Sequence, residues 1–297
     1  MSAWLLPTAL ATEKGSALAA IALDELRQRR VMVPPLPVIE RLCGEVRGRG
    51  ADTEEQLANS PRHLMRDQAK LTRERARGRP VYYTEWIISS NPRDHFHDEP
   101  IAAAYATKIV METDEFVDGY SFWTFTDIFE ENYFPSMPFH GGFGLLNLHG
   151  VPKPIYRAFQ LLHHLGTEKL PVQGAHETVD AWVIRKSCSV TVLLTNHAQP
   201  RREISTELVD VRLTHATEPR AAYIERVDQD HANAPPFCQE MGMPEYPSPL
   251  EVERLQAASR LVKEPMGWTL EEGTIRLNIE LPAHAIAAVT LEFAPKP

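Results

Sequence analysis

One acidic residue closes an apolar, aromatic run in the first third of the chain. Residues 80–87 have side chains that favour a β-strand, and Glu85 lies near the end of the run, directly before Trp86. In a barrel of parallel strands, chemistry takes place at the carboxyl ends of the strands. A carboxylate there could attack or stabilise a cationic anomeric carbon while the neighbouring ring stacks on the sugar. The alternative is a strand that ends in a solvated glutamate.

Length and charge limit the classes of protein that fit. The chain has 297 residues, of which 43% are hydrophobic, and this is enough for one large or two medium domains. Its formal net charge of −9 disfavours a general nucleic-acid-binding protein. The charge is uneven, because residues 1–79 contain 14 Lys and Arg against 10 Asp and Glu. Such a difference between two parts of a chain indicates two origins or two roles.

Three widely separated cysteines, Cys43, Cys188 and Cys238, form no CxxC pair and predict neither a zinc site nor a disulfide framework. Their odd number fits a reducing compartment, so we expect a cytoplasmic protein without a metal or a cofactor. No apolar run reaches the roughly 20 residues that cross a bilayer. The short apolar start lacks a basic region and contains Pro7, so we expect neither secretion nor a membrane partner.

Residues 1–50 have a helical pattern. Ser16 is a suitable N-cap for an apolar stripe that ends in three arginines, and a proline-rich break at residues 34–37 separates it from a second helical stripe. A helical hairpin with basic ends could contact nucleic acid. A solvated charged face is the simpler interpretation, and we do not expect a nucleic-acid partner.

Two further zones follow. Residues 51–170 alternate between helix and strand patterns, which is typical of a parallel α/β sheet or barrel. The expected helices span residues 62–77, 101–112 and 154–165, and the expected strands 81–86 and 117–125. Residues 171–297 contain short β-favouring runs separated by turn residues, as in an antiparallel β-sandwich. The fold class is therefore α/β plus all-β, behind an N-terminal helical segment.

Several distinctive blocks of residues occur between positions 60 and 293. They are residues 83–86, 89–94, 97–98, 118–125, 127–131, 139–145, 152–154 and 156–159, followed by Asp228, His231, Asn233, Met241, Gly242 and Pro244. Together these blocks resemble glycoside hydrolase family 39, which includes β-xylosidases and α-L-iduronidases. The resemblance implies a carbohydrate substrate, either a xyloside or a uronide.

The resemblance also implies a (β/α)8 barrel, an accessory β-sandwich and retaining hydrolysis by two glutamates. Glu85 occupies the position of the nucleophile, and Trp86 directly after it is expected at the substrate. Trp123 resembles the residue that forms the floor of the sugar subsite, and Glu130 or Glu131 resembles the group that binds sugar hydroxyls. From the residue types alone, Trp123 could equally be a core residue, and the two glutamates could belong to a solvated loop.

The chain departs from the family pattern in one respect. An eight-stranded barrel takes about 250 residues, whereas fewer than 170 precede the sandwich here. Only the last two strands can be assigned, so we expect an incomplete barrel remnant with open edges through which the chain could self-associate. The acid/base glutamate of the family stands in an Asn-Glu-Pro context, and none is found. We therefore expect a truncated and catalytically impaired protein.

Three stretches near the N-terminus, residues 4–7, 11–18 and 33–43, are similar to an N-terminal segment of transposases from replicative transposons. No transposase carboxylate triad can be assigned. The hypothesis is a fused reading frame, in which a transposon insertion displaced the first half of a glycosidase gene. Three functions stay open: an active retaining glycosidase, a catalytically incomplete relic that binds sugar, and a nucleic-acid module. We favour the second for this chain.

Overall fold

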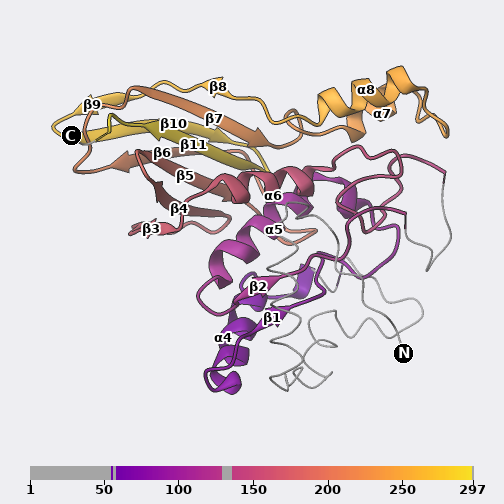
Figure 1. Ribbon diagram of the computed structural model, residues 1–297, viewed down its shortest axis with the longest axis horizontal. Helices are drawn as coiled ribbons and strands as arrows, with labels where there is room; N and C mark the ends of the chain where they lie inside the picture. The colour runs from indigo at the N-terminus through magenta and orange to yellow at the C-terminus, as the bar shows by residue number, and fades with distance from the viewer. Residues whose placement is uncertain (1–54, 56–57, 129–135, 296–297) are drawn as a thin grey trace.

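The computed structural model describes residue 55 and residues 58–128 and 136–295 (Figure 1). The helical segment expected over residues 1–50 lies outside the described residues, as do Glu130 and Glu131. None of the helices in the described part of the chain has the length and apolar character needed to span a bilayer.

Helices dominate the first part of the described chain, and strands dominate the second. The helices are α4 (Leu64–Ala76), η1 (His95–Asp98, a 3-10 helix), α5 (Pro100–Thr113), α6 (Pro154–His164), α7 (Pro235–Glu240) and α8 (Pro249–Ala258). The strands are β1 (Tyr82–Tyr83), β2 (Gly119–Tyr120), β3 (Glu168–Leu170), β4 (Val179–Lys186), β5 (Ser189–Asn196), β6 (Glu207–Leu213), β7 (Ala221–Val227), β8 (Glu264–Pro265), β9 (Thr269–Glu271), β10 (Thr274–Leu281) and β11 (Ile286–Glu292). The three helices expected from the sequence match α4, α5 and α6 within two residues at each end.

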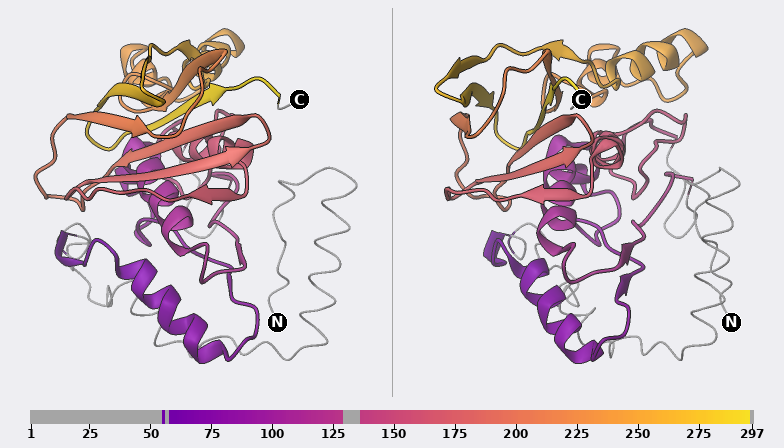
Figure 2. Two further views of the ribbon diagram at one scale, coloured as in Figure 1. Left: turned by 90° about the vertical axis from the view of Figure 1, so that its left-hand side faces the viewer. Right: turned by 60° about the vertical axis from the view of Figure 1, so that its left-hand side comes forward.

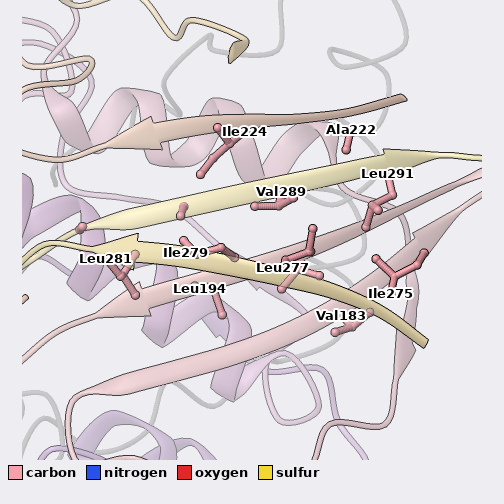
Figure 3. Close-up of a cluster of buried hydrophobic side chains, with 13 residues drawn as sticks. Val183, Leu194, Ala222, Ile224, Ile275, Leu277, Ile279, Leu281, Val289 and Leu291 are labelled. Atoms are coloured by element: carbon pink, nitrogen blue, oxygen red, sulfur yellow. The ribbon is translucent and has the colours of Figure 1, made fainter. Parts of the chain in front are cut away.

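Two antiparallel sheets face each other across one hydrophobic core. The six-stranded sheet has the order β3-β4-β5-β11-β7-β8, and the three-stranded sheet has the order β6-β10-β9. β10 alternates between buried and outward-facing side chains, as an antiparallel strand with one buried face requires. Its buried side chains Ile275, Leu277, Ile279 and Leu281 pack against β4, β5, β7 and β11 (Figure 3). The antiparallel sheets expected from the sequence are therefore present.

Helices α5 and α6 cover the other face of the six-stranded sheet (Figure 1). Met111 of α5 and Leu161 of α6 share a cluster with Leu193 and Ile286 of the sheet. β11 is consequently buried on both of its faces. The turned views in Figure 2 keep α4 on the side of α5 that faces away from the sheets. Because helices and sheet share one core, the domain boundary expected at residue 170 stays a prediction.

Helix α5 lies between the six-stranded sheet and the β1–β2 pair, and it has small residues on both of the sides that face them. Pro100 occupies its first turn, where no N–H is needed. Ala103 and Ala104 pack toward the sheet, whereas Ala102 and Ala106 belong to the cluster around β1 and β2. Small side chains on two sides let the helix approach both layers closely.

β1 and β2 form a parallel pair of two residues each, with Tyr82 opposite Gly119 and Tyr83 opposite Tyr120. The expected strands were longer. The regular ladder stops early because neither strand has a further described strand beside it to continue the pairing. Two short strands do not establish a barrel, so the barrel remnant stays a prediction.

Asp118 anchors this strand pair to α4. One of its carboxylate oxygens accepts hydrogen bonds from the Val81 amide and from Arg73 Nη2, both at 2.7 Å. Partial burial disfavours the charged form, but these hydrogen bonds and the Arg73 charge lower the pKa of Asp118 below its usual value. The carboxylate therefore stays ionised at neutral pH and joins three elements.

A buried polar cluster joins α4 and α5 to β4. Arg62 forms a two-point ion pair with Asp180, with nitrogen–oxygen distances of 2.9 and 2.6 Å. Lys108 is 1% exposed, pairs with Glu112 and lies 3.6 Å from the Asp180 carboxylate. Removing one partner of such a pair leaves an uncompensated buried charge. The cluster therefore fixes the helices on the sheet.

His197 and His284 lie close together beside this cluster, with ring centroids 5.9 Å apart. His197 is buried, and neither of its ring nitrogens has a hydrogen-bond partner within the described part of the chain. Burial lowers the pKa of His284 to about 4 and lowers the pKa of His197 well below its ordinary value. Both rings are therefore neutral at neutral pH.

Acid should destabilise the fold through His284. The unfolded chain takes up a proton near pH 6.5, whereas the folded ring does so only near pH 4. This contribution to stability is therefore complete above pH 6.5 and is lost as the pH falls toward 4, by up to about 3 kcal/mol. Urea unfolding of the wild type at neutral pH and near pH 4 measures this loss of stability. His284→Asn should lose less stability over the same pH range than the wild type does.

His215→Asn is the matched control for this test. His215 has the same left-handed backbone (φ 56°) as His284 but is exposed. Its replacement should leave the pH dependence of unfolding as in the wild type. An unchanged pH dependence in His284→Asn would contradict the assignment.

Truncating the centre of the sandwich core should destabilise the protein strongly. Leu277→Ala removes a fully buried side chain and should lower the free energy of unfolding by about 2–5 kcal/mol. Leu208→Ala, on the neighbouring strand β6 but 84% exposed, should change it by less than about 0.5 kcal/mol. Denaturant titration compares the two, and equal effects would mean that β10 does not form the core described.

Candidate functional site

Glu85 and Trp123 emerge at the same edge of the parallel strand pair. Glu85 lies two residues after β1 and is exposed, and Trp123 lies three residues after β2 and is partly exposed. Because the strands are parallel, their carboxyl ends meet at one edge. The Trp123 amide donates a 3.3 Å hydrogen bond to the carbonyl of Trp86. The sequence therefore brings an exposed carboxylate and an aromatic ring to one place.

Trp86 lies beneath this edge and is only 6% exposed. Its ring makes edge contacts with Tyr120, Phe122 and Phe159 at centroid distances of 5.7, 5.5 and 6.3 Å. The chain bends at Glu85, where Thr84 and Glu85 are both exposed, and Trp86 is the next buried residue. The ring leaves little surface for a sugar, and its place at the substrate stays a prediction.

Two carboxylates and one ammonium lie buried under the loops that follow these strands. Lys153 Nζ is 2.6 Å from Asp98 Oδ1 and 2.8 Å from Asp127 Oδ2. The side chains of Lys153 and Asp127 have no exposed surface, and that of Asp98 is 9% exposed. Burial disfavours the ammonium, but the two carboxylates outweigh it and raise the pKa of Lys153. The Lys153 ammonium therefore stays protonated across the neutral pH range.

These charges hold the backbone of the loop at residues 140–144. Asp98 accepts a 2.6 Å hydrogen bond from the Gly141 amide, and Asp127 accepts one of 2.8 Å from the Gly144 amide. Lys153 Nζ donates to the carbonyl of Gly142 at 2.9 Å. One buried cluster thus joins the loop after β1, the loop after β2 and the glycine-rich loop.

The glycines in this loop are required by close backbone approach. Gly141 has a φ of +74°, and a Cβ there would lie 2.5 Å from the carbonyl oxygen of Asp94. A Cβ on Gly144 would lie 2.3 Å from the backbone of Thr126 and of Asp127. Any larger residue would push the loops apart.

His97 adds a second link between the same loops. Its Nδ1 is 2.8 Å from the carbonyl oxygen of Gly141, and its Nε2 is 2.8 Å from that of Ser89. Burial lowers the pKa of His97, although both carbonyls favour the charged ring. The neutral ring donates one of these two hydrogen bonds, and its tautomer decides which.

Sequence reasoning missed the Lys153 cluster, although one local signal was available. Lys153 is the N-cap residue of α6, next to the positive end of the helix dipole, where a cation is unfavourable. A lysine placed there between two prolines indicates buried acidic partners. Nothing in the spacing identifies Asp98 and Asp127 as those partners, because they come from two other loops.

The comparisons with known proteins decide the family. Residues 49–275 match the model of glycosyl hydrolases family 39. The chain belongs to glycoside hydrolase family 39. Residues 1–46 match a second model, described as a domain of unknown function (DUF4158), which is consistent with the transposase-like segment expected there.

Three similar proteins show how much of the family this chain covers. It is 38% identical to "Beta-xylosidase" of Caldicellulosiruptor saccharolyticus over 82% of this chain and 50% of the relative. It is 34% identical to "Beta-xylosidase" of Geobacillus stearothermophilus over 72% of this chain and 41% of the relative. The crystal structure of the family 39 enzyme from Xanthomonas axonopodis pv. citri is 25% identical, with a TM-score of 0.64 over 80% of this chain and 50% of that one. The family 39 chain thus spans about half the length of these relatives.

Removing the buried cation should unfold the loops around the candidate site. Lys153→Met leaves Asp98 and Asp127 buried together without compensation, so the free energy of unfolding at pH 7 should fall by about 3–5 kcal/mol. Lys70→Met is the control, because Lys70 is exposed on α4 and its loss should change stability by less than about 0.5 kcal/mol. Denaturant titration measures both, and equal stabilities would show that the cluster does not hold the fold.

Proposed function

We propose that this chain carries the nucleophile side of a retaining, xylosidase-type glycosidase site, with Glu85 as the nucleophile. The observation that supports this most is an exposed carboxylate at the carboxyl end of a parallel strand, in a chain of glycoside hydrolase family 39. In this proposal β1 and β2 are the last two strands of an incomplete (β/α)8 barrel within residues 51–170, and residues 171–297 are its accessory sandwich.

The neighbouring residues receive roles that follow from their positions. Trp123 comes from the adjacent strand end and is partly exposed, so we assign it the floor of the sugar subsite. Glu130 and Glu131 follow the anchored Asp127 closely in sequence, and we assign them hydrogen bonds to sugar hydroxyls. Trp86 supports the site from below through its contacts with Tyr120 and Phe122.

The substrate class follows from the relatives. The two curated relatives at 38% and 34% identity are both named "Beta-xylosidase". This favours a xyloside over a uronide as the carbohydrate that the site accepts.

The first step uses only groups that this chain supplies. A Glu85 oxygen attacks the anomeric carbon, a glycosyl–glutamate ester bond forms, and the bond to the leaving oxygen breaks with its electron pair on that oxygen. Retaining enzymes place a second carboxyl group about 5–5.5 Å from the nucleophile to protonate that oxygen. The sequence of this chain contains no Asn-Glu-Pro segment of the kind that carries it in the family.

The chain alone should therefore favour substrates whose leaving group needs no proton. General acid assistance is worth about a hundredfold to ten-thousandfold in rate for a basic leaving oxygen. A dinitrophenolate leaves without it, whereas an alkoxide does not. The proposed activity is accordingly glycosyl transfer from activated xylosides, with little hydrolysis of alkyl xylosides.

Trapping experiments test whether Glu85 forms a glycosyl ester with activated xylosides. With a dinitrophenyl 2-deoxy-2-fluoro-β-xyloside, intact-protein mass spectrometry should show one added fluoroxylosyl group, and peptide mapping should place it on Glu85. With dinitrophenyl β-xyloside, added azide should accelerate turnover, because an anionic nucleophile needs no general base to open the ester. Alkyl xylosides should give no measurable product.

Glu85→Gln should abolish both the label and the azide effect, whereas Glu115→Gln, which changes an exposed glutamate after α5, should retain both. A label on another residue would contradict the assignment of Glu85. Rapid hydrolysis of an alkyl xyloside would contradict the absence of an acid.

A further inference from the structure

A cleft opens where the end of α5 meets β3 and β4, the first two strands of the six-stranded sheet (Figure 1). Its volume is about 360 Å³, and α4 and the segment after β3 also contribute to its lining. Small-molecule sites commonly have volumes of about 300–1,000 Å³ and often lie where two structural units meet. The cleft is therefore large enough to hold a small ligand.

The length of α5 separates this cleft from the candidate site. β1 and β2 are parallel, and α5 lies between them in the chain. Glu85 follows the end of β1, whereas Asp114 and Phe116, which line the cleft, precede the start of β2. These two positions lie at opposite edges of a parallel pair. The 14 residues of α5 span about 20 Å, so the cleft and Glu85 belong to two separate sites.

Apolar side chains form one part of the lining. Trp182 of β4 and Phe116 are partly exposed, and Val172 after β3 is 44% exposed. Trp182 also packs against the cluster that joins α5 and α6 to the sheet, so its ring is held in place. A rigid aromatic ring that stays partly accessible can stack on the C–H face of a sugar.

Polar groups form another part of the lining. Lys169 Nζ donates hydrogen bonds to Asp114 Oδ1 at 2.6 Å and to the carbonyl oxygen of Met111 at 2.8 Å. Within the described residues, this leaves one N–H group of Lys169 and the second Asp114 oxygen for a ligand. Arg66 adds further N–H donors. A hydroxyl group both donates and accepts, so these neighbouring donors and acceptors suit a ligand with several hydroxyl groups.

The charges of the lining favour a neutral ligand. Asp114 carries a negative charge, and Lys169 and Arg66 carry positive charges. An anion or a cation in the cleft would therefore meet a charge of its own sign, which is unfavourable. A neutral sugar makes hydrogen bonds to both kinds of group without this cost.

We propose that this cleft binds a short neutral oligosaccharide of β-linked xylose units, with one ring on Trp182 and hydroxyl groups on Asp114 and Lys169. The choice of xylose rests on the proposed function, whereas the choice of a neutral sugar rests on the cleft itself. The site is distinct from the edge that carries Glu85, so it holds sugar without any need for that carboxylate.

Titration with xylotriose, followed by nuclear magnetic resonance of the indole N–H groups, tests the cleft directly. The chain has five tryptophans, and Trp182→Phe identifies the Trp182 signal by its loss. In the full wild-type chain, this signal should shift and saturate as xylotriose is added. A signal that does not move, or that moves equally with the α-linked glucose trimer maltotriose, would overturn the proposal.

Two arginine variants locate the site. Val172→Arg adds a long cation to the lining that contains Asp114, so the new side chain should be drawn into the cleft and fill it. Xylotriose should then bind about tenfold or more weakly than to the wild type. Because Val172 is exposed, the variant should fold normally.

Val262→Arg is the matched control for this variant. Val262 is 58% exposed and precedes β8, at the opposite edge of the same sheet from β3, and it does not line the cleft. Its affinity for xylotriose should equal that of the wild type. Isothermal titration calorimetry measures both variants, and an affinity of Val172→Arg equal to that of Val262→Arg would overturn the assignment of the cleft.

Glu85→Gln separates this proposal from the proposed function. The Trp182 signal of this variant should respond to xylotriose as in the wild type, although the variant no longer accepts the fluoroxylosyl label. A Trp182 response in a wild-type chain that cannot be labelled on Glu85 would contradict the proposed function alone. Labelling of Glu85 without a Trp182 response would overturn the cleft alone.

Discussion

A single buried ammonium sets the shape of the candidate site. Lys153 has no exposed surface, so its charge is stable only while Asp98 and Asp127 stay within contact distance. Each carboxylate also holds one backbone amide of the glycine-rich loop. Three loops that are distant in sequence therefore depend on one ion cluster. The segments that follow β1 and β2 are therefore held together by this cluster, and Glu85 lies near the start of the first of them.

The two sheets hold the Lys153 cluster in place through helix α6. Lys153 is the N-cap of α6, which packs on one face of the six-stranded sheet, and β10 of the other sheet packs on the opposite face. The core of the sandwich thus anchors the helix that presents the ammonium. The Arg62–Asp180 pair ties the start of α4 to the same sheet. Hydrophobic burial thus determines where the helices and sheets lie, and the ion pairs of Lys153 and Arg62 fix the segments that connect them.

The sequence predicted helices and strands whose formation is determined by local residue patterns. It missed features that depend on contacts between segments distant in the chain. Helical patterns over residues 62–77, 101–112 and 154–165 marked α4, α5 and α6, and short β-favouring runs between turn residues marked the antiparallel strands. Strand propensity could not predict that β1 and β2 pair for only two residues, since pairing requires neighbours. The burial of Trp86 depends on aromatic rings from other parts of the chain, and Asp127 meets Lys153 only through the folded loops. The roles of Glu85 and Trp123 stay predictions from the family.

The alanines of α5 have a mechanical consequence. Ala103 touches the sheet side and Ala106 the strand-pair side, and both are fully buried. At these two positions the helix backbone comes close to both layers, so the packing there is tight. Because the same helix contacts both layers, the position of the strand pair depends on the position of the six-stranded sheet. The six-stranded sheet thereby sets the distance at which α5 holds the β1–β2 pair, and with it the strand end where Glu85 lies.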